Sequence, residues 1–310
     1  MVNRHYQFDK LAVADKLEET LGLAVKVGEP MNMHTSFRVG GPADIYVEPT
    51  TVDELQGALA VISEEGVPYR VIGNGTNLLV SDEGFRGAIL RLGPRFAKWS
   101  RESTKSIWAE AGIPLPVLAK RAANEGLSGL EFMSGIPGTL GGAIHMNAGA
   151  WGSTIGEKVR RIWILGDQDV VKLEKEMLSF SYRQSNLGNK VIVAAEFELA
   201  EASSAEIQEQ MQEYLKRRQD TQPLGLPSAG SVFRNPEGHK SARLIDEAGL
   251  KGLSIGGAQV SPIHANFIVN LGYATASDIY RLISEVQAIV ERETGILLKP
   301  EIEIIGFTTP

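Results

Sequence analysis

The chain of 310 residues contains no cysteine. Disulfide bonds, iron–sulfur clusters, thiolate zinc sites and cysteine nucleophiles are therefore excluded, which fits a reducing compartment such as the cytoplasm. No apolar run approaches the ~20 residues of a membrane-spanning helix. No hydrophobic segment follows the charged N-terminal residues, so the sequence shows no secretory signal. We expect a cytoplasmic protein that does not bind membranes.

Basic residues are in the minority, with 31 Lys and Arg against 38 Asp and Glu and a formal net charge of −7. This balance argues against general nucleic-acid binding, but it is compatible with a local basic pocket for an anionic small molecule. The histidines, at positions 5, 34, 145, 239 and 264, lack the spacing typical of metal ligands. We therefore predict no metal site.

Length and pattern predict an α+β protein of two domains. The first spans residues 1–202, with lobes at about 1–95 and 96–202. The second spans 203–310, with a helix over 203–218 as connector. Further helices are predicted over residues 10–22, from a capping box at Thr51–Glu54 to Gly66, and over 115–126, 241–249 and 276–294. The strands are predicted within PYRVIG, GAILRL, KSIWAEAG, RRIWILG, KVIVAAEFEL, ANFIVNLG and EIEIIG.

Glycine is over-represented, with 33 residues that cluster in loops. The first cluster lies in VIGNGTNLLVSD, residues 71–82, directly after a β-branched strand. Its glycines would let several backbone N–H groups cradle a phosphate. The Asn74-Gly75 pair is equally typical of a two-residue β-hairpin turn. The sequence leaves both interpretations open.

A second cluster, SGIPGTLGGAIHMNAGAWG, spans residues 134–152. So few side chains indicate that the backbone closely approaches a ligand, and an irregular packing loop is the alternative. Leu78 stands where a G-x-G-x-x-G motif needs its third glycine, and no P-loop motif is present. Two such loops without Rossmann glycines suggest an extended ligand with a pyrophosphate, and FAD fits.

Ser231 lies in a third small-residue stretch, SAGSVFRNP, residues 228–236. Serine beside glycine is typical of a turn. No G-x-S-x-G elbow surrounds Ser231, which argues against a hydrolase nucleophile at this position.

Seven segments together resemble one family. They are HTSFRVGGPAD, GNGTNLLVSD, GIPGTLGGAIHMNAGAWG, SYRQSNL, AGSVFRNP, HANFIVNLGYATASDI and KPEIEIIG, in this order. In combination they resemble the UDP-N-acetylenolpyruvoylglucosamine reductases (MurB) from about residue 30 onward. The direct passage through helix 203–218 to the Ser231 loop resembles the shorter type, which lacks an added substrate-capping loop.

The resemblance implies an FAD-binding domain of the p-cresol methylhydroxylase/vanillyl-alcohol-oxidase type, joined to a C-terminal α+β substrate-binding domain. It also implies reduction of UDP-N-acetyl-3-O-(1-carboxyvinyl)-glucosamine to UDP-N-acetylmuramate for peptidoglycan synthesis. The cofactors would be non-covalent FAD and NADPH, the partners the UDP-enolpyruvyl sugar and NADPH, and the protein a monomer.

Three catalytic positions match the family motifs: Arg183 in SYR, Ser231 in GSVFRNP and Glu301 in KPE. Hydride would pass from the flavin N5 to the β-carbon of the enolpyruvyl group, and Ser231 would give a proton to the α-carbon. Arg183 would stabilise the enolate. Glu301 would either be neutral and donate a hydrogen bond, or be ionised and orient Arg183.

The FAD contacts are expected from Arg38 in FRVGG and from both glycine loops. In the loops these are Gly73, Asn74, Gly75, Thr76, Asn77, Leu78, Ser134, Gly135, Ile136, Gly138, Thr139, Gly141, Gly142 and Ala143. Substrate contacts could come from His264 and Asn266, and diphosphate or NADPH contacts from Arg217, Arg218 and Lys240.

Two other functions compete with this one. Another FAD-dependent oxidase or dehydrogenase of the same domain type would be reduced by a 2-hydroxy acid. A non-catalytic nucleotide-sugar-binding protein would be purified without flavin.

Overall fold

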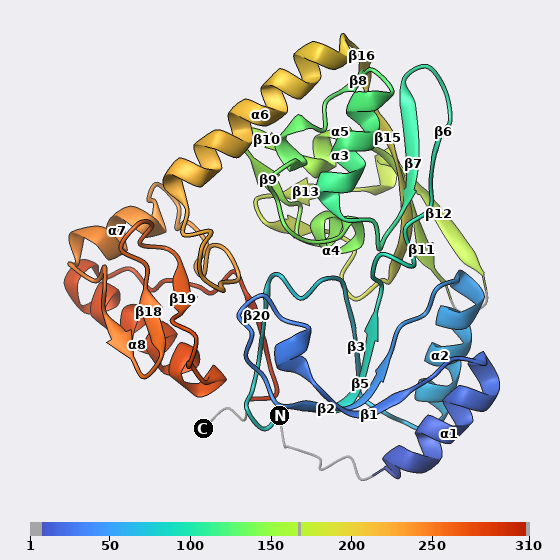
Figure 1. The fold of residues 1–310 in the computed structure, drawn as a ribbon, viewed down its shortest axis with the longest axis horizontal. Coiled ribbons are helices and arrows are strands. Elements are labelled where there is room, and N and C mark those ends of the chain that lie inside the picture. The colour runs from blue at the N-terminus through green and yellow to red at the C-terminus, as the bar shows by residue number, and fades with distance from the viewer. Residues whose placement is uncertain (1–7, 167–168, 308–310) are drawn as a thin grey trace. The chain divides into compact units, whose positions relative to one another are not determined.

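The fold mixes helices and strands along the whole chain (Figure 1), and the computed structural model describes residues 8–166 and 169–307. The α-helices are α1 Lys10–Leu21, α2 Val52–Glu64, α3 Leu115–Asn124, α4 Leu140–His145, α5 Ile155–Lys158, α6 Ser204–Thr221, α7 Ser241–Glu247 and α8 Ala276–Thr294. Within the described residues, the short 3-10 turns are η1 Met31–Met33, η2 Glu131–Met133 and η3 Lys175–Met177. The predicted α+β class is confirmed.

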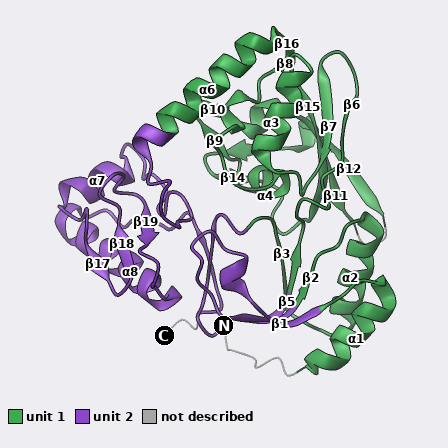
Figure 2. Ribbon diagram, in the orientation of Figure 1, with its two compact units in different colours: residues 1–25, 46–74, 89–218 green, residues 26–45, 75–88, 219–310 purple. Residues whose placement is uncertain are grey.

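The described chain groups into two compact units (Figure 2). Unit 1 takes in the described residues of 1–25, 46–74 and 89–218, and unit 2 those of 26–45, 75–88 and 219–310. Both units are discontinuous, because two short N-terminal segments group with the C-terminal third of the chain. This grouping by contacts leaves the predicted sequence domains, 1–202 and 203–310, as a prediction.

Unit 1 contains an antiparallel sheet of five strands in the order β12-β11-β15-β7-β6. The strands are β6 Trp99–Arg101, β7 Ser106–Glu110, β11 Val159–Leu165, β12 Val170–Glu174 and β15 Ile192–Glu198. Helix α4 packs against β15 and β7. Helices α1 and α2 pack together, with Lys16 bridging Glu64 and Glu65 at 2.9 and 2.6 Å.

The remaining sheets are small. One sheet has the strand order β1-β2-β5-β3. Its strands are β1 Lys26–Pro30, β2 Pro42–Val47, β5 Phe85–Arg91 and β3 Tyr69–Ile72. The two-stranded pairs are β9 Gly149–Ala150 with β10 Ser153–Thr154, β13 Phe180–Ser181 with β14 Gln184–Ser185, and β8 Leu127–Ser128 with β16 Ala200–Glu201.

Unit 2 is built around α8. Its apolar face is buried at Ile279, Leu282, Ile283, Val286 and Val290, in one core with Phe233, Val260 and Ile268. The face packs on the antiparallel sheet of β17 Ser254–Ile255, β18 Ala258–Val260 and β19 Ile268–Asn270. A separate parallel pair joins β4 Leu78–Val80 to β20 Glu303–Ile305.

All the predicted helices are present, and α8 has the predicted bounds. The connector helix is longer than predicted, because α6 runs to Thr221. The capping box at Thr51 forms only in part. Thr51 accepts from the backbone N–H of Glu54, but the Glu54 carboxylate accepts from Thr50. The hairpin interpretation of Asn74-Gly75 is wrong, since β3 and β4 pair in different sheets.

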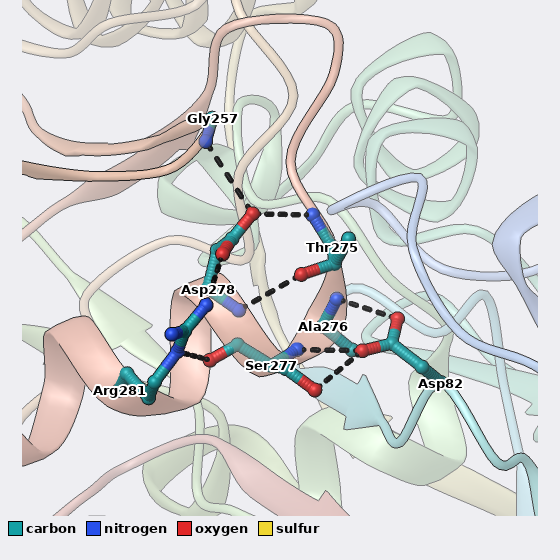
Figure 3. Close-up of polar contacts among 7 residues, drawn as sticks. All are labelled: Asp82, Gly257, Thr275, Ala276, Ser277, Asp278 and Arg281. Carbon is teal, nitrogen blue, oxygen red and sulfur yellow. Dashed lines mark hydrogen bonds and ion pairs between the residues drawn. The ribbon is translucent and has the colours of Figure 1, made fainter.

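The N-terminus of α8 is held from a distant part of the sequence (Figure 3). The Asp82 carboxylate accepts from the backbone N–H groups of Ala276 and Ser277, each at 2.8 Å, and from the Ser277 hydroxyl at 2.6 Å. Thr275 and Asp278 form a reciprocal capping box. These contacts satisfy amide groups that a helix N-terminus leaves without intrahelical partners. Asp82 thereby fixes the end of its own loop to α8.

Asp278 makes the stability of the protein dependent on pH. The hydrogen bond from the Thr275 backbone, with others from the Thr275 hydroxyl, the Gly257 backbone and Arg281, lowers the pKa of the Asp278 carboxyl, although burial opposes this. Its folded pKa therefore lies below the unfolded value of about 3.9. The stabilisation is fully present above pH ~4 and is lost as the pH falls through the folded pKa.

We therefore expect Asp278→Asn to be less stable than wild type at pH 7 and to lose less stability on acidification below pH ~4. Urea unfolding at a series of pH values measures the free energy of unfolding of both proteins at pH 7 and its slope against pH in acid. Equal acid slopes in the two proteins would contradict this role of Asp278.

Candidate active site

Ser231 and Glu301, 70 residues apart, lie on adjoining segments of unit 2. Ser231 forms an antiparallel bridge with Phe267, and the next residues, Val232–Arg234, run beside Lys299–Glu301. The backbone N–H of Glu301 donates to the Val232 carbonyl at 2.7 Å, and that of Arg234 to the Lys299 carbonyl at 2.9 Å. The structure thus brings together two of the three predicted catalytic residues.

The first glycine loop also reaches Glu301. The Asn77 amide nitrogen donates to the Glu301 carbonyl at 3.1 Å, and the Glu303 N–H donates to the Asn77 carbonyl at 2.9 Å. The β4–β20 pairing places these residues side by side. The loop predicted to hold FAD therefore also fixes the backbone of a predicted catalytic residue, and Leu78 begins the strand that does so.

Gly75 lets this loop approach residues 34–38. Its φ is +60°, and a Cβ there would lie 1.9 Å from the His34 carbonyl oxygen, so no other residue fits without displacing backbone. Ser36 N–H donates to the Gly75 carbonyl at 3.1 Å. Arg38, at the end of this 34–38 segment, is exposed and has a left-handed φ of 56°.

Gly73 brings the first glycine loop onto the second within unit 1. A Cβ on Gly73 would lie 2.1 Å from the Thr139 hydroxyl oxygen. Beside it, the Asn74 side chain accepts from Arg91, whose guanidinium also pairs with Glu48 at 2.9 Å. These contacts juxtapose two of the segments predicted to bind FAD.

The second loop, residues 134–152, is held partly through its own backbone. Gly141 N–H donates to the Ala111 carbonyl at 2.8 Å, which fixes the first turn of α4. A Cβ on the next residue, Gly142, would lie 4.0 Å from the Thr139 hydroxyl oxygen, its nearest neighbour. Ile136 and Ala143 flank this stretch, and Gly138 has a φ of 124°.

Ser134 supplies a test of the expected FAD site. The residue is only 6% exposed, and its hydroxyl oxygen has no hydrogen-bond partner among the described residues. A buried hydroxyl without a partner is costly in a folded chain, so such groups commonly meet a ligand or water. This orphaned hydroxyl and the adjoining glycines fit a loop that receives a polar cofactor.

Arg183 lies at the tip of the β13–β14 hairpin in unit 1. Its φ is 54°, and its guanidinium lies 3.5 Å from the Gly149 carbonyl and 5.3 Å from the centre of the Tyr182 ring. The hairpin is anchored by Asn147, whose amide donates to the Ser181 carbonyl at 2.8 Å and accepts from Gly156 N–H at 3.1 Å.

Backbone strain marks the predicted site. Among residues 8–166 and 169–307, the non-glycine residues with left-handed φ are Arg38, Asn147, Trp151 and Arg183. Each such residue costs on the order of 1–3 kcal/mol, and such strain concentrates at functional sites. Two of the four, Arg38 and Arg183, are predicted site residues, and Asn147 supports the hairpin that carries Arg183.

Three of the other candidates, His264, Asn266 and Arg217, have structural partners. Asn266 binds the backbone of Phe233 through its amide, and the His264 ring packs edge-on against Phe267. Burial lowers the pKa of His264, so its imidazole is neutral at pH 7. Arg217 pairs with Glu213, and Lys240 is the N-cap residue of α7.

Arg218 differs from these candidates. A Cβ on Gly135 would lie 2.9 Å from its Cδ, so its side chain runs along the second glycine loop, and burial lowers the pKa of its guanidinium. Nearby, the Trp151 and Tyr214 rings stack with centroids 5.7 Å apart.

Among residues 8–166 and 169–307, no three or more His, Cys, Asp or Glu side chains are grouped so that they could hold a metal ion. In the same part of the chain, no helix is long and apolar enough to cross a membrane.

Comparison with known proteins identifies the family. The FAD binding domain family matches residues 43–163, and the family of UDP-N-acetylenolpyruvoylglucosamine reductase C-terminal domains matches residues 222–305. The reductase of Caldanaerobacter subterraneus subsp. tengcongensis is 44% identical over 298 residues, covering 95% of this chain and 98% of that protein. The chain belongs to the UDP-N-acetylenolpyruvoylglucosamine reductase family. The Alkaliphilus oremlandii reductase is 45% identical over 91% of this chain and 93% of its own length.

A solved structure extends this result to three dimensions. The crystal structure of the reductase (MurB) from Thermus caldophilus matches with a TM-score of 0.76 and 37% identity, covering 90% of this chain and 98% of that one. The family assignment from sequence motifs is therefore confirmed, and FAD and NADPH are the cofactors of this reductase family member. The assignment disfavours both competing functions.

Proposed function

We propose that this protein reduces UDP-N-acetyl-3-O-(1-carboxyvinyl)-glucosamine to UDP-N-acetylmuramate with NADPH as the electron source. Identity of 44% across 95% of the chain with a named reductase supports this reaction. The structural observation that carries it is the placement of Ser231 beside the Glu301 segment, through the bond from Glu301 N–H to the Val232 carbonyl at 2.7 Å.

The residues that would hold FAD are Arg38 and those of the two glycine loops named above. Ser134 would complete its hydrogen bonding with the cofactor, because its buried hydroxyl has no partner among the described residues. When bound, FAD would supply the hydride-transfer chemistry that links NADPH to the β-carbon of the enolpyruvyl group. Asn77 would contact it with atoms other than its amide nitrogen, which donates to Glu301.

Ser231 would donate a proton to the α-carbon on the face opposite the hydride. A hydroxyl is a weak acid, so its position must be fixed within about 3 Å of the carbon. The bridge to Phe267 and the left-handed turn at Gly230, with φ 76°, support such a fixed position.

Arg183 would bind the substrate carboxylate and stabilise the enolate that forms on it. Its guanidinium is always protonated and can donate two parallel hydrogen bonds. Its left-handed φ of 54° means that the hairpin holds this residue in a strained backbone conformation. Such strain is common at functional sites.

Glu301 would act on the same carboxylate, either as a neutral hydrogen-bond donor or as an anion that orients Arg183. We expect Glu301→Gln to distinguish these roles, because glutamine is neutral and can donate. If Glu301 is a neutral donor, the variant keeps turnover within about tenfold of wild type. If it is an anion, turnover falls by about 10²-fold or more. Steady-state kcat with the UDP-enolpyruvyl sugar measures this.

We also propose that the protein acts as a monomer in the cytoplasm, in line with the family resemblance. The reaction itself is tested by incubating the purified protein with NADPH and the UDP-enolpyruvyl sugar. NADPH consumption that requires the sugar, with a product heavier by two hydrogen atoms, supports the proposal. NADPH consumption that the sugar leaves unchanged, together with reduction of the flavin by a 2-hydroxy acid, would contradict it.

A further inference from the structure

Asn266 pairs with both backbone polar groups of Phe233, two residues after Ser231. The Phe233 N–H donates to the Asn266 side-chain oxygen at 2.9 Å, and the Asn266 amide nitrogen donates to the Phe233 carbonyl at 2.8 Å. In addition, the Val232 N–H donates to the Asn266 backbone carbonyl at 2.8 Å. One residue therefore makes three hydrogen bonds to the segment that carries Ser231.

The side chain of Asn266 replaces a missing stretch of strand. The bridge between Ser231 and Phe267 begins an antiparallel pairing, but the chain before Phe267 turns away, with Phe267 N–H donating to the His264 carbonyl at 2.9 Å. Phe233 is thereby left without a backbone partner on this side. The amide of Asn266 offers one acceptor and one donor in the geometry of a peptide group, and so extends the pairing by one residue.

The same segment is held on its other edge by Lys299–Glu301. Val232 and Arg234 bond to that edge, while both polar groups of Phe233 are bound by Asn266. Asn266 is only 5% exposed, and its amide is committed to Phe233, so it is poorly placed to contact substrate. The distance between Ser231 and the Glu301 backbone thus depends on a segment fixed from both sides.

We propose that Asn266 is a positioning residue that fixes Ser231 for proton transfer to the substrate. This inference rests on the proposed role of Ser231. Removing the amide leaves the buried N–H and carbonyl of Phe233 without partners, and the segment would shift to regain them. A displacement of 1 Å at a reacting group can cost about 100-fold in rate.

The experiment compares the two half-reactions by anaerobic stopped flow on the FAD-loaded protein. For Asn266→Ala we expect FAD reduction by NADPH at the wild-type rate. We expect FAD reoxidation by the UDP-enolpyruvyl sugar to slow by about 10- to 100-fold. Asp278→Asn serves as the matched control, because it removes the capping box at the α8 N-terminus of the same unit and lies outside the predicted cofactor loops. It should lower the melting temperature and leave the ratio of the two rates unchanged.

Asn266→Asp adds a signature that a general loss of stability would not give. Ionised, the new side chain can accept from the Phe233 N–H but repels the Phe233 carbonyl. Protonated, it can donate to that carbonyl and restore the pair. Because burial raises the pKa of such a carboxyl, the reoxidation rate relative to wild type should rise as the pH is lowered.

Ser231→Ala, measured in parallel, distinguishes failure of the proton-donor role of Ser231 from failure of the positioning role of Asn266. If its reoxidation is as fast as in wild type, the proposed proton donor is wrong and the inference about Asn266 is overturned with it. If Ser231→Ala is slow but Asn266→Ala reoxidises at the wild-type rate, or slows both half-reactions equally, the inference about Asn266 alone is overturned. A pH-independent rate ratio for Asn266→Asp would likewise overturn it.

Discussion

Replacing Ser231 with alanine is expected to slow FAD reoxidation by the UDP-enolpyruvyl sugar by about 10²–10⁴-fold, the usual contribution of a positioned general acid. FAD reduction by NADPH should keep its wild-type rate, because that step requires no proton at the substrate α-carbon. The substitution removes one oxygen atom from a half-buried position, so the fold should be retained. Rapid-reaction absorbance of the flavin measures the two steps separately.

Ser228→Ala is the matched control for this variant. It removes a hydroxyl from the same small-residue stretch, three positions before Ser231. Both of its half-reactions should proceed as in wild type. Equal slowing of both steps in Ser231→Ala, or no slowing, would show that Ser231 is not the proton donor.

Arg183→Gly is expected to separate activity from stability. Turnover should fall by about 10²–10³-fold, the usual cost of removing a group that stabilises developing negative charge. The free energy of unfolding should change by less than about 1 kcal/mol, because glycine relieves the left-handed conformation at φ 54° and this offsets the lost side-chain contacts. Steady-state kinetics and urea unfolding measure the two effects.

Arg183→Lys keeps the charge but loses the planar pair of donors, so its turnover should lie between those of wild type and Arg183→Gly. Wild-type turnover in Arg183→Gly would exclude the carboxylate-binding role. A destabilisation of about 2 kcal/mol or more would show instead that the arginine is held for the fold.

Local features of the fold were predictable from the sequence because their causes are local. The α8 stripe recurs at helical spacing from Ile279 to Val290, and the structure places those side chains in one core. The order of the glycine and serine motifs was enough to identify the family. The Asn74-Gly75 pair misled, since its turn preference is local whereas the partners of the flanking strands are distant.

The support of the site could not be predicted, because it depends on contacts across long sequence separations. Asn77 and Glu301 are 224 residues apart, and Asp82 and Ala276 are 194 apart. Nothing in HANFIV distinguishes an asparagine that binds substrate from one that pairs with the Phe233 backbone. The left-handed φ of Arg183 was equally hidden, because arginine gives no local signal for that conformation.

The most direct test is anaerobic. The purified protein should be yellow from bound flavin, lose that colour when reduced with NADPH, and regain it when the UDP-enolpyruvyl sugar is added. This sequence of events is the result that we predict. A colourless protein, or a reduced flavin that the sugar does not reoxidise, would contradict the proposed reaction.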